Sequence, residues 1–224
     1  MRILAVWGSP SSGKTIMSVK LARYIASQKK NVILVLADMS APPLPYVCPP
    51  SDLEAETSLG NILGTAHVDE NLIKQNAILH KKNEYLTMLA MLKGETAFSY
   101  APYTDTQARE LLAELRRLAD YIIIDCTSDI TNDALSAVSL IESDAVLRLV
   151  SCNLKSMEDW IFRIDVAGVP ERAEDFHKMK TETLTLPADE QYMQDIAEAL
   201  GERNIDECVS MKFESMIPHI NNDT

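Results

Sequence analysis

The segment that most constrains this chain is GSPSSGKT, residues 8–15, close to the amino end. It fits the pattern G-x-x-x-x-G-K-[ST], in which glycines let the backbone curl so that consecutive N–H groups point inward at an anion. A short apolar run, residues 2–7, precedes it, and residues 16–27 carry apolar side chains at helical spacing. A strand, a glycine-containing loop and a helix in this order predict a polyphosphate site at the start of the helix.

The residue types of this loop fit a nucleoside triphosphate with Mg²⁺, and ATP is the ligand that we expect. Lys14 would neutralise the β and γ phosphates, and the Thr15 hydroxyl would ligate Mg²⁺. The backbone would supply the other contacts, so the predicted nucleotide-binding residues are Gly8, Ser9, Pro10, Ser11, Ser12, Gly13, Lys14, Thr15 and Ile16. The alternative interpretation is a loop of Gly and Ser with an incidental lysine.

Two aspartates follow apolar runs that are typical of buried strands. Asp125 ends the run at residues 120–125, and Asp38 follows the run at residues 32–37. An aspartate at the end of a strand beside the loop can hold Mg²⁺ directly or through water, so Thr15 and Asp125 are the predicted metal ligands. Asp38 is placed to orient a water or to reach the metal, and it forms the predicted catalytic pair with Lys14. Taken alone, either aspartate could instead cap a turn or a helix.

Strand and helix patterns alternate along the chain and predict one α/β domain with a doubly wound, mostly parallel sheet flanked by helices. We expect this domain over residues 1–204, followed by a tail over residues 205–224. The expected strands are residues 2–7, 32–37, 84–94, 120–125, 144–152 and 182–187. The expected helices are residues 16–27, 105–119, 132–142 and 189–202, with another near 156–162 and two short ones within 58–82, broken near Gly64.

Two local signals complete this description of the chain. Five prolines within residues 41–50 exclude a helix there and predict an extended surface loop. Asp105 is the expected acidic N-cap of the helix at residues 105–119, whose leucines fall on one face.

The composition and net charge restrict the cellular compartment and the classes of partner that we expect for the domain. The 224 residues are 46% hydrophobic and 24% charged, as in ordinary soluble domains. No apolar run approaches the roughly 20 residues of a membrane span, and the opening residues do not make a signal peptide, so we expect a cytoplasmic protein without an integral membrane segment. The net charge is −12, and residues 154–224 hold 16 acidic against 7 basic side chains. Direct binding to nucleic acid is therefore not favoured.

The cysteines and histidines give no further site. The four cysteines lack paired metal-ligand spacing and the density of a disulfide scaffold, which indicates reduced thiols; they are Cys48, Cys126, Cys152 and Cys208. His67 and His80 have no carboxylate partners at ligand spacing, so we expect no metal there.

The order of segments resembles the ParA and MinD ATPases, including the pilus-localisation branch called CpaE or TadZ. The resemblance covers residues 1–156 and rests on the loop followed by VLAD, SLGNIL, EYLTMLAMLKG, LRRLADYIIIDC and ESDAVLRLVSCNLKS. It implies a homodimer that sandwiches ATP, with slow hydrolysis as a timer for positioning cellular machinery such as a pilus or secretion apparatus. In this pattern Lys14 and Thr15 match the P-loop, Asp38 the second switch-I aspartate, and Asp125 the Walker B aspartate.

The chain also departs from that family's pattern. Ser9 stands where the family usually has a signature lysine, Leu36 replaces the first aspartate of D-x-D, and the segment CTSD after Asp125 has no glycine. These departures bear on hydrolysis and leave two other hypotheses. One is a non-hydrolysing scaffold whose loop is a relic; the other is a small-molecule phosphoryl transferase, which would need convergent basic residues that the acidic C-terminal third offers sparsely.

Overall fold

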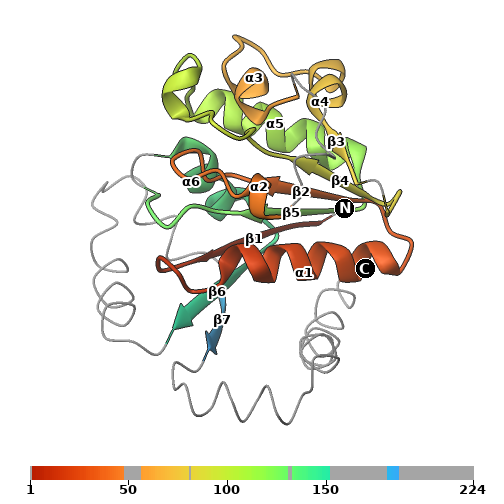
Figure 1. Cartoon of the computed structure of the whole chain (residues 1–224), viewed down its shortest axis with the longest axis vertical. Coiled ribbons are helices and arrows are strands. Elements are labelled where there is room, and N and C mark those ends of the chain that lie inside the picture. The colour runs from red at the N-terminus through yellow and green to blue at the C-terminus, as the bar shows by residue number, and fades with distance from the viewer. Residues whose placement is uncertain (1, 48–56, 81, 131–132, 152–180, 187–224) are drawn as a thin grey trace.

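A computed structural model describes residues 2–47, 57–80, 82–130, 133–151 and 181–186. Seven strands form one sheet in the order β3-β4-β2-β5-β1-β6-β7 (Figure 1). All neighbouring strands are parallel except β3 with β4. The strands are β1 (Arg2–Gly8), β2 (Val32–Leu36), β3 (Ile78–Leu79), β4 (Leu86–Leu89), β5 (Tyr121–Asp125), β6 (Ala145–Ser151) and β7 (Thr181–Leu186). This confirms the predicted doubly wound, mostly parallel α/β fold.

Helices cover both faces of the sheet (Figure 1). On one face, α1 (Lys14–Ser27) packs Met17, Leu21 and Ala22 against the strands. Buried side chains on the other face come from α3 (Leu59–Leu63), α4 (Glu70–Asn76), α5 (Asp105–Leu118) and α6 (Ala134–Glu142). Because β2 and β5 are buried along nearly their whole length, they are continuous apolar runs rather than alternating ones.

The position of β5 determines where the site forms. β5 lies between β1 and β2, so Asp125 is in register with Val6 of β1 and with Leu36 of β2. Parallel strands end at the same edge of a sheet, and therefore the loop after β1, the segment after β2 and Asp125 meet there. The sequence places these three segments far apart, and only the pairing of β5 brings them together.

Three local expectations are corrected by the structure. Residues 41–50 were expected to exclude a helix, yet α2 (Leu44–Val47) forms a single turn, in which the Pro43 carbonyl accepts the N–H groups of Tyr46 and Val47. Prolines are tolerated here because the first turn of a helix does not need their missing N–H groups. The N-cap of α5 is Thr104, not Asp105; Thr104 and Gln107 form a capping box, and Asp105 stands in the first turn. Finally, Ile78 and Leu79 form the short antiparallel strand β3, in a region expected to be helical.

The other expected elements are confirmed wherever the structure describes them. The two short helices α3 and α4 are present, and Gly64 is the C-cap of α3. The strand expected at residues 84–94 is the shorter β4. The helices expected near 156–162 and at 189–202 lie outside the described residues. Within the described part of the chain, no helix has the length and apolar character that a bilayer crossing requires.

Candidate phosphate-binding site

The loop between β1 and α1 is held against the neighbouring strand β6. A Cβ atom at Gly8 would lie 2.0 Å from the backbone oxygen of Leu149, so only glycine allows this approach. Gly13 has φ of 85° and precedes α1 as its N-cap, a left-handed conformation that glycine adopts without strain. Ser11 is also left-handed, with φ of 60°. These turns place the amino end of α1 at the carboxyl edge of the sheet, where a helix start favours an anion.

The Ser12 side chain tests whether the loop fits a phosphate group. Ser12 is 2% exposed, and its hydroxyl oxygen has no hydrogen-bond partner among the residues that the structure describes. A buried hydroxyl without a partner is costly in a folded protein. A phosphate oxygen in the loop would supply an acceptor for this group, so the residues present fit the ligand that the sequence predicts.

Lys14 carries the only side-chain cation within the loop of residues 8–15. Its ammonium donates to the backbone oxygen of Ser9 at 3.0 Å and to the Ser128 hydroxyl oxygen at 2.6 Å. The first contact curls the lysine back over its own loop, and the second connects it to the segment that follows β5. The ammonium is thus held at the loop, where it can neutralise phosphate charge.

Two hydroxyl groups of α1 donate to the carboxylate at the end of β5. Thr15 donates to Asp125 Oδ2 at 2.7 Å, and Ser18 donates to Asp125 Oδ1 at 3.1 Å. Ser18 lies one helical turn after Lys14 and also contacts the Lys14 carbonyl at 2.9 Å. A hydroxyl and a carboxylate this close are the hard oxygen ligands that Mg²⁺ prefers. The structure therefore brings together Thr15 and Asp125, the two predicted metal ligands.

Burial dominates the electrostatics of Asp125, which is 2% exposed. Loss of water raises the pKa of this carboxyl to about 6, against the lowering effects of the Thr15 and Ser18 hydrogen bonds and of the Lys14 charge. The negative charge of Asp38 adds a smaller raising effect. A cation beside this carboxylate would relieve the cost of burying its charge. The positive charge already near Asp125 therefore does not fully offset the cost of burying this carboxylate.

Asp38 lies at the same edge of the sheet but is engaged with its own turn. Its Oδ1 atom accepts the backbone N–H groups of Ser40 and Ala41, at 3.0 and 2.9 Å. The turn-capping role that the sequence left open for this aspartate is therefore present. Its charge also raises the pKa of Asp125 and that of Asp133, so Asp38 is electrostatically part of the site. Its catalytic role stays a prediction.

Residues around the start of α6 fix the segment after Asp125. The Thr127 N–H donates to the Ser136 hydroxyl at 2.9 Å, and Asp133 caps α6 by accepting the Ser136 N–H. Tyr103 donates its hydroxyl to Asp133 Oδ1 and accepts the Leu135 N–H. Burial, followed by the Asp133 charge, raises the pKa of Tyr103, which stays a neutral donor.

The sequence reasoning missed Ser18, Ser128 and the Tyr103–Asp133 pair. Ser18 could have been found because it stands four residues after Lys14, on the same helix face. Ser128 follows Asp125 by three residues, within the CTSD segment already noted as unusual. The contact between Tyr103 and Asp133 spans thirty residues and has no local signal.

The two histidines for which no metal was expected each have a hydrogen-bond partner. His67 pairs with Glu110, and His80 accepts the Lys82 N–H. Over the described ranges, no group of three or more His, Cys, Asp or Glu side chains could hold a metal ion. Cys126 is a free, buried thiol whose pKa is raised by burial, and the other three cysteines lie outside the described residues.

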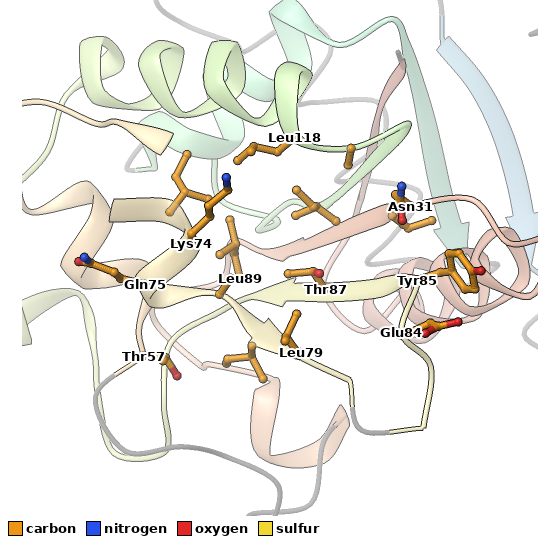
Figure 2. A pocket seen from close by; sticks show the side chains of 16 residues that line it. Asn31, Thr57, Lys74, Gln75, Leu79, Glu84, Tyr85, Thr87, Leu89 and Leu118 are labelled. Atoms are coloured by element: carbon orange, nitrogen blue, oxygen red, sulfur yellow. The ribbon is translucent and has the colours of Figure 1, made fainter. Parts of the chain in front are cut away.

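A cavity of about 640 Å³ lies away from the loop. Figure 2 shows Lys74 of α4, Thr87 of β4 and Leu118 of α5 around it. Its lining includes Val32 and Ile33, at the amino end of β2. Ligands of open α/β sheets bind at the carboxyl ends of the strands, and none of the loop residues lines this cavity. The loop, and not this cavity, therefore lies at the edge of the sheet where a phosphate ligand is expected.

The parallel sheet, the loop at the end of its β1 strand and the start of α1 define the P-loop class of nucleotide-binding proteins. The AAA domain family model matches residues 3–162. The chain belongs to this family, and its fold is that of the ParA/MinD-type ATPases. No curated protein sequence matches the chain.

Solved structures of the same fold are similar over most of their length. McdA from Cyanthece, solved without ligand, matches with a TM-score of 0.64 and 15% identity, over 94% of this chain and 98% of that one. The cell division ATPase MinD of Pyrococcus furiosus matches with a TM-score of 0.61 and 19% identity, over 96% and 99%. MinD of Pyrococcus horikoshii, solved with Mg-ADP, matches with a TM-score of 0.59 and 18% identity, over 88% and 85%. At these identities the likeness establishes the fold.

Proposed function

We propose that this chain binds Mg·ATP at residues 8–16 and hydrolyses it slowly. The observation that carries the proposal is the contact of Thr15 and Ser18 with the buried Asp125, beside the ammonium of Lys14. This arrangement offers one cation for phosphates and one hydroxyl–carboxylate pair for a metal. The MinD of Pyrococcus horikoshii, which shares the fold, was solved with Mg-ADP and supports the choice of ligand.

Each residue has a defined part in this proposal. The backbone N–H groups of the loop enclose the phosphates, and Lys14 leaves the Ser9 oxygen to neutralise their charge. Thr15 and Asp125 hold Mg²⁺, which supplies charge neutralisation on the phosphate oxygens when bound. Asp38, at the neighbouring strand end, orients a water. Ile16 is 67% exposed on the first turn of α1 and can contact the nucleotide from outside the loop.

We further propose that nucleotide controls a homodimer that recruits or positions another assembly in the cytoplasm. The ParA/MinD-type fold supports this role, and the acidic surplus of residues 154–224 argues for a protein partner rather than nucleic acid. The position of the family's signature lysine is held by Ser9, which is 6% exposed. A degraded signature lysine favours the CpaE/TadZ-like branch, whose partner is a pilus or secretion apparatus. Residues 1–204 form the nucleotide-binding domain and residues 205–224 the tail.

A non-hydrolysing scaffold is the second candidate. It is favoured by Ser9, by Leu36 in place of the first D-x-D aspartate, and by Asp38, whose Oδ1 is engaged in its own turn. Release of inorganic phosphate from Mg·ATP distinguishes the two. A scaffold releases none above the rate of the Lys14→Ala variant, whereas a slow ATPase releases it and loses the activity with that lysine.

Nucleotide titration combined with measurement of molar mass tests the main proposal. Wild type is expected to bind Mg·ATP with a Kd of about micromolar, a range set by a few charge-assisted contacts. It is also expected to double its molar mass with a non-hydrolysable ATP analogue. Lys14→Ala is expected to lose both responses, while Lys30→Ala, which removes an exposed lysine far from the loop, keeps them. Equal binding by wild type and Lys14→Ala would refute the proposal.

A further inference from the structure

The cavity of about 640 Å³ has a floor made of one row of side chains that crosses three strands. Thr87 of β4 is in register with Leu79 of β3 and with Ile33 of β2, and all three line the cavity. Residues directly opposite one another in neighbouring strands present their side chains to the same face of a sheet. The row continues into Ile122 of β5, which is fully buried in the cluster that contains the α5 leucines. Helices therefore cover one end of this row, and the cavity lies over the other end.

The cavity exists because two helices end beside it. α4 ends at Asn76 and contributes Ile73 and Lys74 of its last turn, while Leu118 ends α5 (Figure 2). β3 has only two residues, so it protects just half of the edge of β4. As a result Thr87, in the middle of the floor, is only half-buried.

The size and lining of the cavity suit a small apolar molecule. Ligand pockets in proteins typically enclose roughly 300–1,000 Å³ and are mostly apolar, with a few polar groups that orient the ligand. Here Ile33, Leu89 and Leu118 supply apolar surface, and the Thr87 hydroxyl is a polar group on the floor. Leu79 is 71% exposed, which is rare for a large apolar side chain among the described residues. A ligand that covers Leu79 would gain from removing this surface from water.

Lys74 supplies the charge that selects an anionic ligand. It is the only cation among the described residues that line the cavity. Its ammonium donates to Glu70 on the same helix, with 61% and 48% of the two side chains exposed. An exposed ion pair of this kind contributes little stability, and an ammonium has three donors. Lys74 can therefore bind a ligand carboxylate in addition to Glu70 or in its place.

The only anion of this lining, Glu84, is exposed in the turn before β4. Figure 2 shows it beside Tyr85, at the other end of the cavity from Lys74. Two further exposed cations, Lys29 and Lys30, directly precede the lining residue Asn31. Within a chain of net charge −12, this edge of the sheet is thus supplied with lysines.

We propose that this cavity is a second ligand site, which binds a small molecule with an apolar body and one carboxylate. The apolar body lies on the row Leu79–Thr87–Ile33 and against Leu118, and the carboxylate accepts from the ammonium of Lys74. The site lies at the amino ends of β2 and β4, whereas the phosphate loop lies at the carboxyl edge of the sheet. The inference is therefore independent of the proposed function.

Two probes with the same apolar chain and opposite charge test this proposal. We would titrate the full-length protein with decanoate and with decylamine by calorimetry near neutral pH, both below the concentrations at which they form micelles. Wild type is expected to bind decanoate saturably and at least about tenfold more tightly than decylamine, because decanoate gains a charge-assisted hydrogen bond to Lys74. Lys74→Gln is expected to weaken decanoate binding about tenfold. Lys93→Gln, which removes an exposed lysine that does not line the cavity, should match wild type.

A substitution that fills the cavity tests the position of the apolar body. Thr87→Phe is expected to abolish saturable binding of decanoate, whereas Thr106→Phe, at an exposed position in the first turn of α5, should leave it unchanged. Thermal unfolding verifies that each variant is folded, and Ala77→Phe, which fills the same cavity from the end of α4, takes the place of Thr87→Phe should that variant not fold. No binding of decanoate to wild type, or equal binding by the folded cavity-filling variant, would show that the cavity is not a ligand site. Equal affinity for both probes, or no effect of Lys74→Gln, would overturn the assignment of an anionic ligand.

Discussion

Replacement of Asp125 by asparagine is expected to stabilise the nucleotide-free protein near neutral pH. Burial raises the pKa of Asp125 to about 6 from an ordinary value of 3.8. The folded state therefore binds this proton more tightly than the unfolded state, and the free energy of unfolding falls as pH rises through the window between those values. The shift corresponds to roughly 3 kcal/mol lost above the window. Asparagine avoids this loss but weakens the hydrogen bonds from Thr15 and Ser18 by about 1 kcal/mol, which leaves a net gain of about 2 kcal/mol.

Urea unfolding without Mg²⁺ and nucleotide measures this gain. The free energy of unfolding of Asp125→Asn and wild type would be compared near pH 7.5 and near pH 5, and the gain should shrink to about half of its size or less at the lower pH, because the folded wild type is protonated there. Asp120→Asn, an exposed aspartate at the opposite end of β5, controls for the change of residue type. If Asp125→Asn is less stable than wild type near pH 7.5, or if its gain is the same at both pH values, the reasoning from buried charge is refuted.

Two further substitutions test the packing and the polar contacts that position the site. Gly8→Ala is expected to lower the free energy of unfolding by about 2 kcal/mol or more, because its Cβ would overlap the Leu149 backbone oxygen. Gly94→Ala, left-handed but in open space, should cost only about 1 kcal/mol in the same urea experiment, and equal losses would contradict the role of close packing. Tyr103→Phe is expected to cost about 1–2 kcal/mol, since Asp133 loses a donor inside the protein. A melting temperature equal to that of wild type would show that this contact contributes no stability.

Much of the fold follows from local signals in the sequence. The apolar runs at residues 32–37 and 120–125 are too continuous for exposed strands, and they become the buried β2 and β5. The leucines of residues 105–119 mark one helix face, which packs into the core as α5. The boundaries were less predictable, because a cap depends on which side chain reaches the free N–H groups. Thr104 rather than Asp105 does so.

In the candidate site, too, some residues could be predicted from the sequence and others could not. The residues proposed to bind through main-chain geometry, Gly8 to Thr15, follow from one local motif, because glycine and a helix start are sufficient to build a phosphate loop. Asp125 could be proposed from its place at the end of a strand. Ser128 could not, because its contact with Lys14 joins residues 114 positions apart. Asp38 was given two possible roles, and its turn contacts became visible only with the backbone of residues 38–41 in place.

The sequence by itself determined the loop, the strands and most of the helices, since these depend on interactions within a few residues. The tertiary structure decided that β5 lies between β1 and β2, and with it the pairing of Asp125 with Thr15 and the burial that raises the pKa of Asp125. Strand order is set by long-range packing, which leaves no periodic trace in the chain. For that reason the ligand class could be predicted from the amino-acid sequence, whereas the electrostatics of Thr15 and Asp125, the proposed metal ligands, and the contact of Ser128 with Lys14 required the fold.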